Sequence, residues 1–216
     1  MNPTKVVIVD YGMGNIRSVH NALVRLGCSV TTSDNVEDLK NADALILPGV
    51  GAFGEAVSNL TSRGLVDPLI RLVREDRKPL LGICLGMQLL ADTSCERGAH
   101  KGLGLIPGEI QRIEVPPTLR LPHVGWNSVQ IKRPVPLFSE VPEGGAFYFV
   151  HSYHFVCDAE HVAATTDYGG EVVAAVQKDR VYGVQFHPER SQTNGLLLLA
   201  NFVAAVDGIR AGEDTC

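Results

Sequence analysis

The stretch LLGICLGMQLL, residues 80–90, places a cysteine between two glycines. The apolar residues before Cys84 have the length of a buried strand, and those from Gly86 onward have the spacing of a helix. A strand, a tight turn and a helix, with small residues two positions before and after the turn, form the pattern of a nucleophile elbow. At Gly82 or Gly86, a side chain would clash as strand and helix pack around the bend. We therefore predict a sharp turn at Cys84.

Two interpretations of Cys84 compete. A free cysteine most often packs as a small buried hydrophobe, whereas an elbow exposes its thiol for chemistry. A helix that begins directly after the cysteine would favour the thiolate, and the Leu85 amide would point to where an oxyanion forms. The paired glycines favour the reactive thiol. The cysteines without such neighbours are interpreted as packing thiols: Cys28, Cys95, Cys157 and Cys216.

Composition disfavours several classes of protein. The 216 residues carry 19 Lys and Arg against 24 Asp and Glu, a net charge of −5, which argues against a nucleic-acid partner. No apolar run reaches the roughly 18 residues of a membrane span, and the N-terminus lacks the pattern of a secretory signal. The five cysteines include no C-x-x-C pair, which predicts free thiols in a reducing, cytoplasmic setting. His151 and His154 would face opposite sides of one strand, so no metal site is expected.

The first half of the sequence alternates between strands and helices. Continuous apolar runs predict strands covered on both faces, hence a parallel sheet with helical crossovers. We expect an α/β fold with one domain at 1–206, a mostly parallel central sheet flanked by helices, and a C-terminal tail at 207–216. The predicted strands are 5–10, 42–49 and 78–84, and the predicted helices are 15–27, 65–76 and 86–94.

The second half is predicted to add further strands to this fold. Turn residues separate short apolar or alternating runs, and two proline-containing stretches, 114–126 and 132–145, are predicted as loops. A closing helix is expected from about 193 to 206. The predicted strands are 109–115, 127–132, 146–155, 161–168, 171–178 and 180–186.

A cysteine nucleophile needs a base, and the base needs a group that orients it. The segment VYGVQFHPER supplies both, at His187 and Glu189. Residues i and i+2 of an extended segment point the same way, so Glu189 can reach the His187 ring, and Pro188 is expected to end the strand. If this strand lies parallel to and beside the strand before Cys84, both residues emerge at the carboxyl end of the sheet, where open α/β sheets place their sites.

A literal G-x-G-x-x-G follows the second predicted strand, at Gly49, Gly51 and Gly54. The motif is typical of dinucleotide-binding loops. It also fits a flexible loop that lends the Val50 amide as a second oxyanion donor beside the elbow. We prefer the second interpretation, because Pro48 opens the turn and a lone match of this kind is a frequent false positive.

Seven motifs together resemble those of class I (triad) glutamine amidotransferases, and within these the glutaminase subunits of imidazole glycerol phosphate synthase. The elbow and the H-P-E segment are shared by the wider superfamily, whereas DYGMGN and PHVGWN single out this subunit. The resemblance covers nearly the whole chain, implies a flavodoxin-like fold, and identifies 1–206 as a glutamine amidotransferase type 1 domain. The motifs are VDYGMGNIRSV, LPGVGAFGEA, GICLGMQLL, KGLGLIPG, LPHVGWN, YFVHSY and GVQFHPERS.

The resemblance implies a reaction and the residues that perform it. L-Glutamine would be hydrolysed to glutamate and ammonia through a glutamyl thioester, with Cys84 as nucleophile, His187 as base and acid, and Glu189 orienting His187. The family's oxyanion donors correspond to the amides of Val50 and Leu85, once the glycine loop turns one amide inward. The substrate-binding residues would be Gly49, Gly51, Gln88, Ser152 and Tyr153.

The resemblance also implies a partner. Such subunits form heterodimers with a (β/α)₈-barrel cyclase, which uses the ammonia to make imidazole glycerol phosphate and an aminoimidazole carboxamide nucleotide (AICAR) in histidine biosynthesis. We expect no cofactor and low activity of the isolated chain. Arg190 stands where related sequences often have lysine, so a planar fork replaces a point charge. The residues expected near the partner are Asn15, Trp126, Asn127 and Arg190.

Two other hypotheses stay open on the residues alone. The chain could be a stand-alone triad hydrolase or a different amidotransferase, such as the glutaminase of cofactor or folate synthesis, which mixing with each candidate synthase would distinguish. It could also be a non-enzymatic nucleotide-binding module that uses the G-x-G-x-x-G, which titration with NAD or ATP would test.

Overall fold

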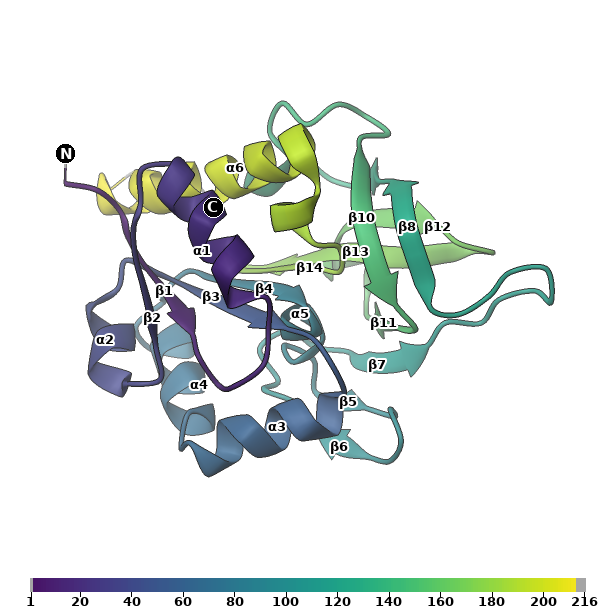
Figure 1. Cartoon of the computed structure of the whole chain (residues 1–216), viewed down its shortest axis with the longest axis horizontal. Helices are drawn as coiled ribbons and strands as arrows, with labels where there is room; N and C mark the ends of the chain where they lie inside the picture. The colour runs from purple at the N-terminus through teal and green to yellow at the C-terminus, as the bar shows by residue number, and fades with distance from the viewer. Residues whose placement is uncertain (1, 213–216) are drawn as a thin grey trace.

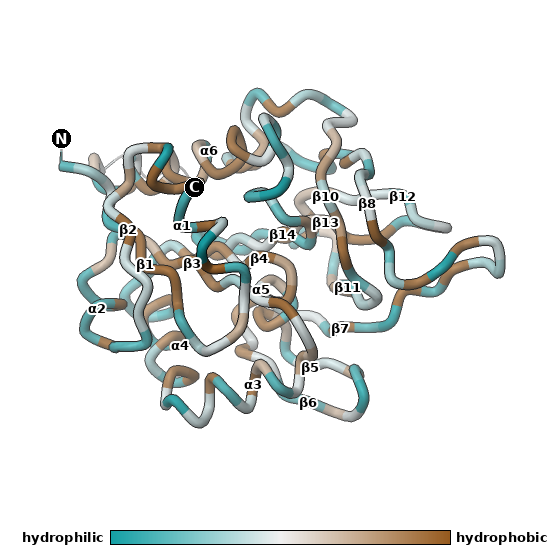
Figure 2. Tube along the Cα trace, viewed as in Figure 1, coloured by the Kyte–Doolittle hydropathy of each residue, from teal (hydrophilic) through white to brown (hydrophobic). Residues whose placement is uncertain are grey.

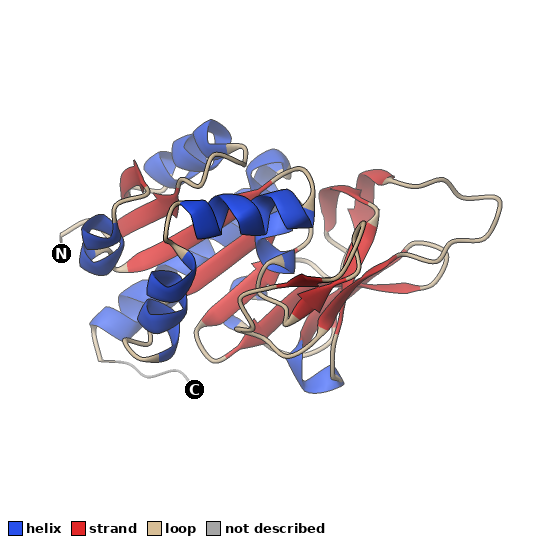
Figure 3. Ribbon diagram, turned by 90° about the horizontal axis from the view of Figure 1, so that it is seen from below, coloured by secondary structure: helices blue, strands red, loops and turns tan. Residues whose placement is uncertain are grey.

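An eight-stranded mixed sheet forms the centre of the computed structural model, which describes residues 2–212. From β2 to β14 neighbouring strands are parallel, and from β14 to β9 they are antiparallel. Figure 3 shows helices on both sides of the sheet and smaller strands at one end. The predicted α/β fold is confirmed. The strand order is β2 (Ser29–Ser33), β1 (Lys5–Val9), β3 (Ala44–Gly49), β4 (Leu80–Cys84), β14 (Val181–Val184), β13 (Glu171–Lys178), β12 (Val162–Asp167) and β9 (Gln130–Ile131).

Alternate residues of the parallel strands belong to two separate cores. Val6 and Ile8 of β1 share one core with side chains of α1 (Ile16–Arg25) and α6 (Gln192–Arg210). Val7 and Val9 share the other core, on the opposite face. Burial on both faces explains the continuous apolar runs of the central strands, and Figure 2 shows β1 and β3 largely in brown. The second face is covered by α2 (Val36–Asn41), α3 (Phe53–Ser62), α4 (Val66–Arg74) and α5 (Leu85–Gln88).

Residues 93–156 contribute the strands of two small sheets beside the antiparallel end of the large one. One is an antiparallel pair, and the other has four strands in the order β11-β7-β5-β6. Figure 1 shows the segment between β7 and β8 projecting from the body of the molecule. The pair is β8 (His123–Ser128) with β10 (Ala146–His151). The four strands are β11 (Tyr153–Val156), β7 (Glu109–Arg112), β5 (Thr93–Ser94) and β6 (His100–Lys101), and the 3₁₀ turns are η1 (Pro136–Phe138), η2 (Ala159–His161) and η3 (Pro188–Arg190).

Several predicted elements differ from the structure. The strand predicted at 146–155 is two strands, because Ser152 separates β10 from β11 and these pair in different sheets. The strand predicted at 127–132 is likewise divided between β8 and β9, and β8 begins at His123, inside the stretch 114–126 that was predicted as a loop. Strands β2, β5 and β6 and helices α2 and α3 were not predicted. The residues of β2 are intermediate or exposed, so this edge strand lacks the apolar run that marks its neighbours.

The closing helix α6 continues four residues beyond its predicted end at 206, to Arg210. The Arg210 side chain contacts Asp207 at 3.0 Å and Asp43 at 3.5 Å, which holds the last turn against the body of the protein. The division into a domain at 1–206 and a tail at 207–216 stays a prediction, and residues 213–216 lie outside the described chain. Within residues 2–212, no helix combines the length and the apolar character needed to cross a bilayer.

Candidate active site

Cys84 ends strand β4 with backbone angles of φ 56° and ψ −112°. A positive φ is uncommon for a residue other than glycine and is often found where strain serves function. Helix α5 begins at the next residue, Leu85, so the chain has the sharp turn that the sequence predicts. The Cys84 side chain is buried but lines a cavity of about 590 Å³.

Only glycine fits on either side of this turn. A Cβ atom at Gly86 would lie 1.7 Å from the carbonyl oxygen of Leu47 in β3, and one at Gly82 would lie 2.6 Å from the carbonyl oxygen of Gly86. The clash at Gly82 is the one predicted between strand and helix. At Gly86 the nearest obstacle is instead the neighbouring strand β3. The glycine pair therefore allows β3, β4 and α5 to approach one another directly behind Cys84.

Helix α5 is shorter than predicted. The expected helix at 86–94 is a single turn, Leu85–Gln88. The carbonyl groups that follow it accept hydrogen bonds from the segment 103–106, for example from the Leu103 amide to the Leu89 oxygen at 2.9 Å, so they are not available to extend the helix. Because one turn has only a small dipole, the expectation that a helix dipole favours the thiolate is not supported. The Leu85 amide still follows Cys84 directly at the turn, as its predicted role as an oxyanion donor requires.

His187 reaches Cys84 because β14 and β4 are parallel neighbours, with Val184 paired to Ile83. The two strands are therefore the parallel neighbours that a contact between His187 and Cys84 requires. The strand ends earlier than predicted, at Val184, and residues Pro188–Arg190 form a 3₁₀ turn. The segment after β14 therefore carries the imidazole over the carboxyl edge of the sheet, beside the sulfur.

Glu189 contacts the far side of the His187 ring. The distance from His187 Nδ1 to Glu189 Oε1 is 3.0 Å, and the two side chains are 7% and 1% exposed. The predicted contact is present, but its cause is the 3₁₀ turn of η3 and not the alternation of an extended strand. Asn15, which was expected at a partner face, donates from Nδ2 to the same carboxylate oxygen at 3.4 Å.

The protonation of His187 follows from these neighbours. Burial alone lowers the pKa of His187, but hydrogen bonds to Cys84 and Glu189, with the charges of both, outweigh it and raise the pKa to about 10. The imidazole is therefore protonated at neutral pH. A protonated ring beside the sulfur stabilises a thiolate, which is the nucleophilic form of cysteine.

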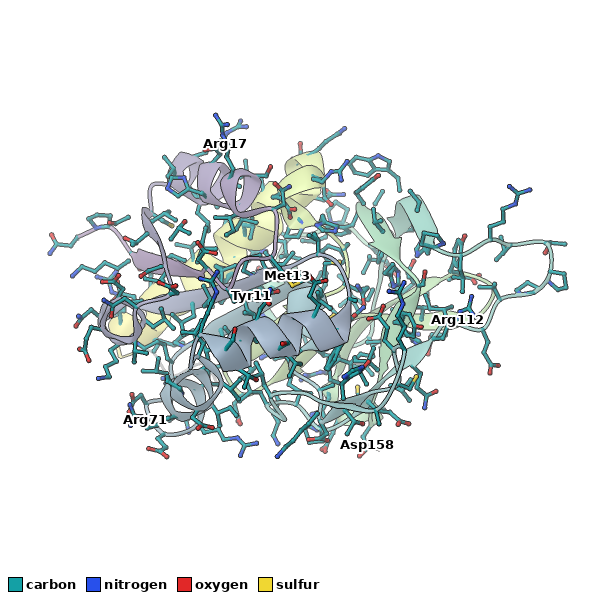
Figure 4. The ribbon with its side chains drawn as sticks, turned by 60° about the horizontal axis from the view of Figure 1, so that its bottom comes forward. Tyr11, Met13, Arg17, Arg71, Arg112 and Asp158 are labelled. Carbon is teal, nitrogen blue, oxygen red and sulfur yellow. The ribbon has the colours of Figure 1, made fainter. Side chains whose placement is uncertain are left out.

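The glycine loop after β3 borders the same cavity. Val50 lines the cavity and is 43% exposed. Gly49 does not line it: this residue is buried below, where a Cβ atom would lie 2.6 Å from the Tyr11 hydroxyl oxygen. Tyr11 donates to the Pro48 carbonyl at 2.8 Å and so supports the loop from beneath. Figure 4 shows Tyr11 beside helix α3. The position of the loop over Cys84 fits the oxyanion interpretation better than dinucleotide binding.

The cavity brings together most of the predicted substrate-binding residues: Gly51, Gln88, Ser152 and Tyr153. It also contains charged side chains that the sequence analysis missed, Glu96, Arg97 and Arg112. Glu96 accepts a hydrogen bond from the Phe53 amide at 2.7 Å, and Figure 4 shows Arg112 on the side of the small strands. Charged residues on loops and exposed strands follow no apolar pattern, so the sequence carries no signal for them.

A pair of buried histidines lies at the cavity, which His151 helps to line. His123 and His151 are paired across β8 and β10, and His123 Nδ1 lies 3.0 Å from His151 Nε2. Burial lowers the pKa of His123 to about 4 and that of His151 to about 3, so both rings are neutral at pH 7. His151 and His154, predicted to face opposite sides of one strand, lie instead on two strands, β10 and β11.

The other residues expected near a partner have different surroundings. Trp126 is 49% exposed and lies edge-on to Tyr148, with ring centroids 6.0 Å apart. The Arg190 guanidinium lies 4.3 Å from the centroid of the same tyrosine ring and lines the cavity. Asn127 follows Trp126 on β8 and donates to the Asp167 carbonyl at 2.8 Å, so its side chain is engaged within the chain.

Residues 7–206 match the family model described as glutamine amidotransferase class-I. The chain belongs to this family. The amidotransferase is 50% identical over 198 residues to the imidazole glycerol phosphate synthase subunit HisH of Moorella thermoacetica, covering 91% of this chain and 93% of that protein. It is 48% identical over 203 residues to the HisH subunit of Syntrophotalea carbinolica, covering 91% and 98%. The resemblance proposed from the motifs is confirmed.

Solved structures confirm the fold of the amidotransferase. A putative GMP synthase protein from Thermoplasma acidophilum superposes with a TM-score of 0.76 at 18% identity, covering 99% of this chain and 98% of that one. A structure described as a glutamine amidotransferase superposes with a TM-score of 0.72 at 23% identity, covering 93% and 98%. At these identities the similarity concerns the fold alone.

Proposed function

We propose that this amidotransferase is the glutaminase subunit of an imidazole glycerol phosphate synthase and hydrolyses L-glutamine to glutamate and ammonia. The observation that carries the proposal is the arrangement of Cys84, His187 and Glu189 at one edge of the sheet, beside a cavity of about 590 Å³. Pockets for small molecules commonly measure about 300 to 1,000 Å³. The similarity to HisH subunits supports the choice of this reaction over that of another amidotransferase.

In the first half of the reaction, the Cys84 thiolate attacks the side-chain amide carbon of glutamine. The amides of Leu85 and Val50 donate to the oxyanion that forms. The imidazolium of His187 gives its proton to the amide nitrogen, which leaves as ammonia, and a glutamyl thioester remains on Cys84. Glu189 accepts the hydrogen bond of Nδ1–H, so the opposite ring nitrogen faces the reacting atoms.

In the second half, neutral His187 takes a proton from water, and the resulting hydroxide attacks the thioester carbon. Collapse of this intermediate releases glutamate and restores the thiolate beside the imidazolium. One water is consumed and one ammonia is released for each glutamine. The residues that hold the substrate are Gly49, Gly51, Gln88, Ser152 and Tyr153, with Gly49 acting through the position of the loop backbone.

The ammonia passes to a (β/α)₈-barrel cyclase subunit, which forms imidazole glycerol phosphate and AICAR in histidine biosynthesis. This chain supplies the hydrolase activity and the partner supplies the lyase activity. Trp126 and Val124, which alternate along β8 and are 49% and 55% exposed, form an apolar surface that supports an interface there. Asn15 and Arg190 complete this face at the cavity. The free thiols of the described cysteines support a cytoplasmic location.

A glutaminase assay in three conditions tests the proposal: the chain alone, with the barrel subunit, and with the barrel subunit plus its nucleotide ligand. We expect the activity to be low in the first condition and highest in the third, because an uncoupled subunit would waste glutamine. Cys84→Ala should abolish activity in all three and leave the circular dichroism spectrum unchanged. Substantial turnover by Cys84→Ala, or stimulation only by a different synthase, would overturn the proposal.

A further inference from the structure

Gln185 is a fully buried polar residue that contacts two residues of the cavity lining, the nucleophile Cys84 and Gln88. It follows β14, and because Val184 pairs with Ile83, Gln185 lies level with Cys84 at the edge of the sheet. Its side chain is 0% exposed. The Nε2 atom lies 3.8 Å from Cys84 Sγ, and Oε1 accepts a hydrogen bond from Gln88 Nε2 at 3.0 Å.

The direction of this hydrogen-bond chain is set by a backbone carbonyl. Gln88 Nε2 also donates to the carbonyl oxygen of Tyr153, at 3.1 Å. A carbonyl oxygen only accepts, so the amino group of Gln88 must face it. The same amino group then needs an acceptor on Gln185, which turns Oε1 of Gln185 toward Gln88 and its N–H groups toward the sulfur. Reversing either amide would place two donors or two acceptors opposite each other.

The sulfur has a competing neighbour that suits its neutral form. The Val150 carbonyl oxygen lies 3.9 Å from Cys84 Sγ, where it can accept from an S–H group but would repel a thiolate. An N–H donor has the opposite preference, because a thiolate accepts a hydrogen bond far better than a thiol does. The balance between Val150 and Gln185 therefore bears on the ionisation of Cys84.

We propose that Gln185 is a further catalytic residue of the glutaminase reaction: its side-chain N–H donates to the Cys84 sulfur and stabilises the thiolate. Through its oxygen it also fixes Gln88, whose carbonyl oxygen is left to accept a hydrogen bond from the substrate. The proposal rests on the proposed function, because it takes Cys84 as the nucleophile.

Gln185→Glu tests the donor and leaves the rest of the chain of hydrogen bonds in place. The carboxylate keeps an acceptor for Gln88 but presents an oxygen, and a negative charge, to the sulfur. We expect the rate of alkylation of Cys84 by iodoacetamide at pH 7, measured by peptide mass spectrometry, to fall by about tenfold or more. The exposed Cys95 provides the internal reference and should keep its rate.

The pH dependence separates a catalytic role from a structural one. In Gln185→Glu, the pH of half-maximal alkylation of Cys84 should rise by about one unit or more, so that high pH restores the rate. Gln185→Met has a side chain of similar size with no donor and no charge. In this variant the pH of half-maximal alkylation should rise by less than in Gln185→Glu. The variant should also lower kcat/KM for glutamine in the presence of the barrel subunit. Gln130→Glu, at the exposed position of strand β9, provides the matched control for the change of charge.

Wild-type alkylation rates and an unchanged pH profile in folded Gln185→Glu would overturn the proposal for Gln185. If that variant does not fold, wild-type alkylation rates and an unchanged pH profile in Gln185→Met would overturn the proposal instead. Neither result would affect the proposed function, which is tested separately by wild-type glutaminase activity and its loss in Cys84→Ala. Conversely, a chain without glutaminase activity under any partner condition would contradict the proposed function even where Gln185 alters the reactivity of Cys84.

Discussion

Nδ1 of His187 lies 3.0 Å from Oε1 of Glu189, and both side chains are almost completely buried. The carboxylate is thus one of the groups that raise the pKa of His187 to about 10, against the effect of burial, which lowers it. The Glu189 carboxylate thus fixes the orientation of the His187 ring and favours its protonated form. A substitution that keeps the size and shape of the Glu189 side chain can test the orientation and the protonation of His187 without disturbing the fold.

Glu189→Gln should reduce glutaminase kcat by about 100-fold or more, since general acid–base catalysis contributes about 10² to 10⁴. KM should change little, because Glu189 does not line the cavity. The pKa of His187 should fall toward its ordinary value, because both the hydrogen bond and the charge of Glu189 are lost, and NMR of the labelled ring measures this. A variant that keeps a third of the wild-type kcat would contradict the assigned role.

Gly86→Ala should prevent the native elbow from forming, because its Cβ would lie 1.7 Å from the Leu47 carbonyl oxygen. We expect a loss of more than about 3 kcal/mol in the free energy of unfolding, or failure to fold, measured by urea denaturation. Gly64→Ala provides the control. It has a φ of 66° with no atom within 4 Å of the added Cβ, so it should lose only about 1 to 2 kcal/mol for the backbone conformation. Equal losses in the two variants would refute the steric argument.

Stability should fall as the pH drops from about 6.5, because the pKa values of His123 and His151 are lowered to about 4 and 3 in the folded chain. The unfolded chain binds protons at these histidines first, so the stabilisation is present above pH 6.5 and is lost toward the folded values. Each group contributes up to about 1.4 kcal/mol per pH unit. His187, with its raised pKa, acts in the opposite direction, and its stabilisation is lost as the pH rises toward 10.

Urea unfolding at pH 6.5 and 5.5 measures this effect. His151→Gln removes one of the two neutral histidines, so the variant should lose less stability over this interval than the wild type, by up to about 1.4 kcal/mol. The comparison of differences cancels the contribution of the carboxylates, which are the same in both proteins. An identical pH dependence would show that the pair does not titrate as described.

Trp126→Ala should weaken, by about tenfold or more, the binding of the barrel subunit, because exposed tryptophans at an interface commonly carry much of the binding energy. Titration calorimetry with the purified partner measures the change. Val24→Ala is the control, since Val24 is 50% exposed on α1 and lies outside the β8 surface. Thermal unfolding of the isolated variants should match the wild type. Equal affinities for wild type and Trp126→Ala would remove the β8 surface from the interface.

Much of the catalytic geometry was predictable because it depends on local chemistry. Gly82 and Gly86 are required by contacts of backbone with backbone, so the elbow at Cys84 could be inferred from residue size alone. The apolar runs of β1, β3 and β4 follow from burial on both faces, which predicts a parallel sheet. The contact between His187 and Cys84 could then be predicted from a single assumption, that the strand before the H-P-E segment lies parallel to and beside the strand before Cys84.

The sequence by itself thus determined the parallel strands β1, β3 and β4, the elbow at Cys84 and the identities of the candidate triad residues. The tertiary structure decided the length of α5, because amides of the segment 103–106 donate hydrogen bonds to the carbonyl groups that follow this helix. It also decided the 3₁₀ turn that places Glu189 against His187. It also decided the pairing of His123 with His151 and the contacts of Gln185. These features depend on which distant strands become neighbours and in which register, and a hydrogen bond between such residues leaves no periodic pattern along the chain.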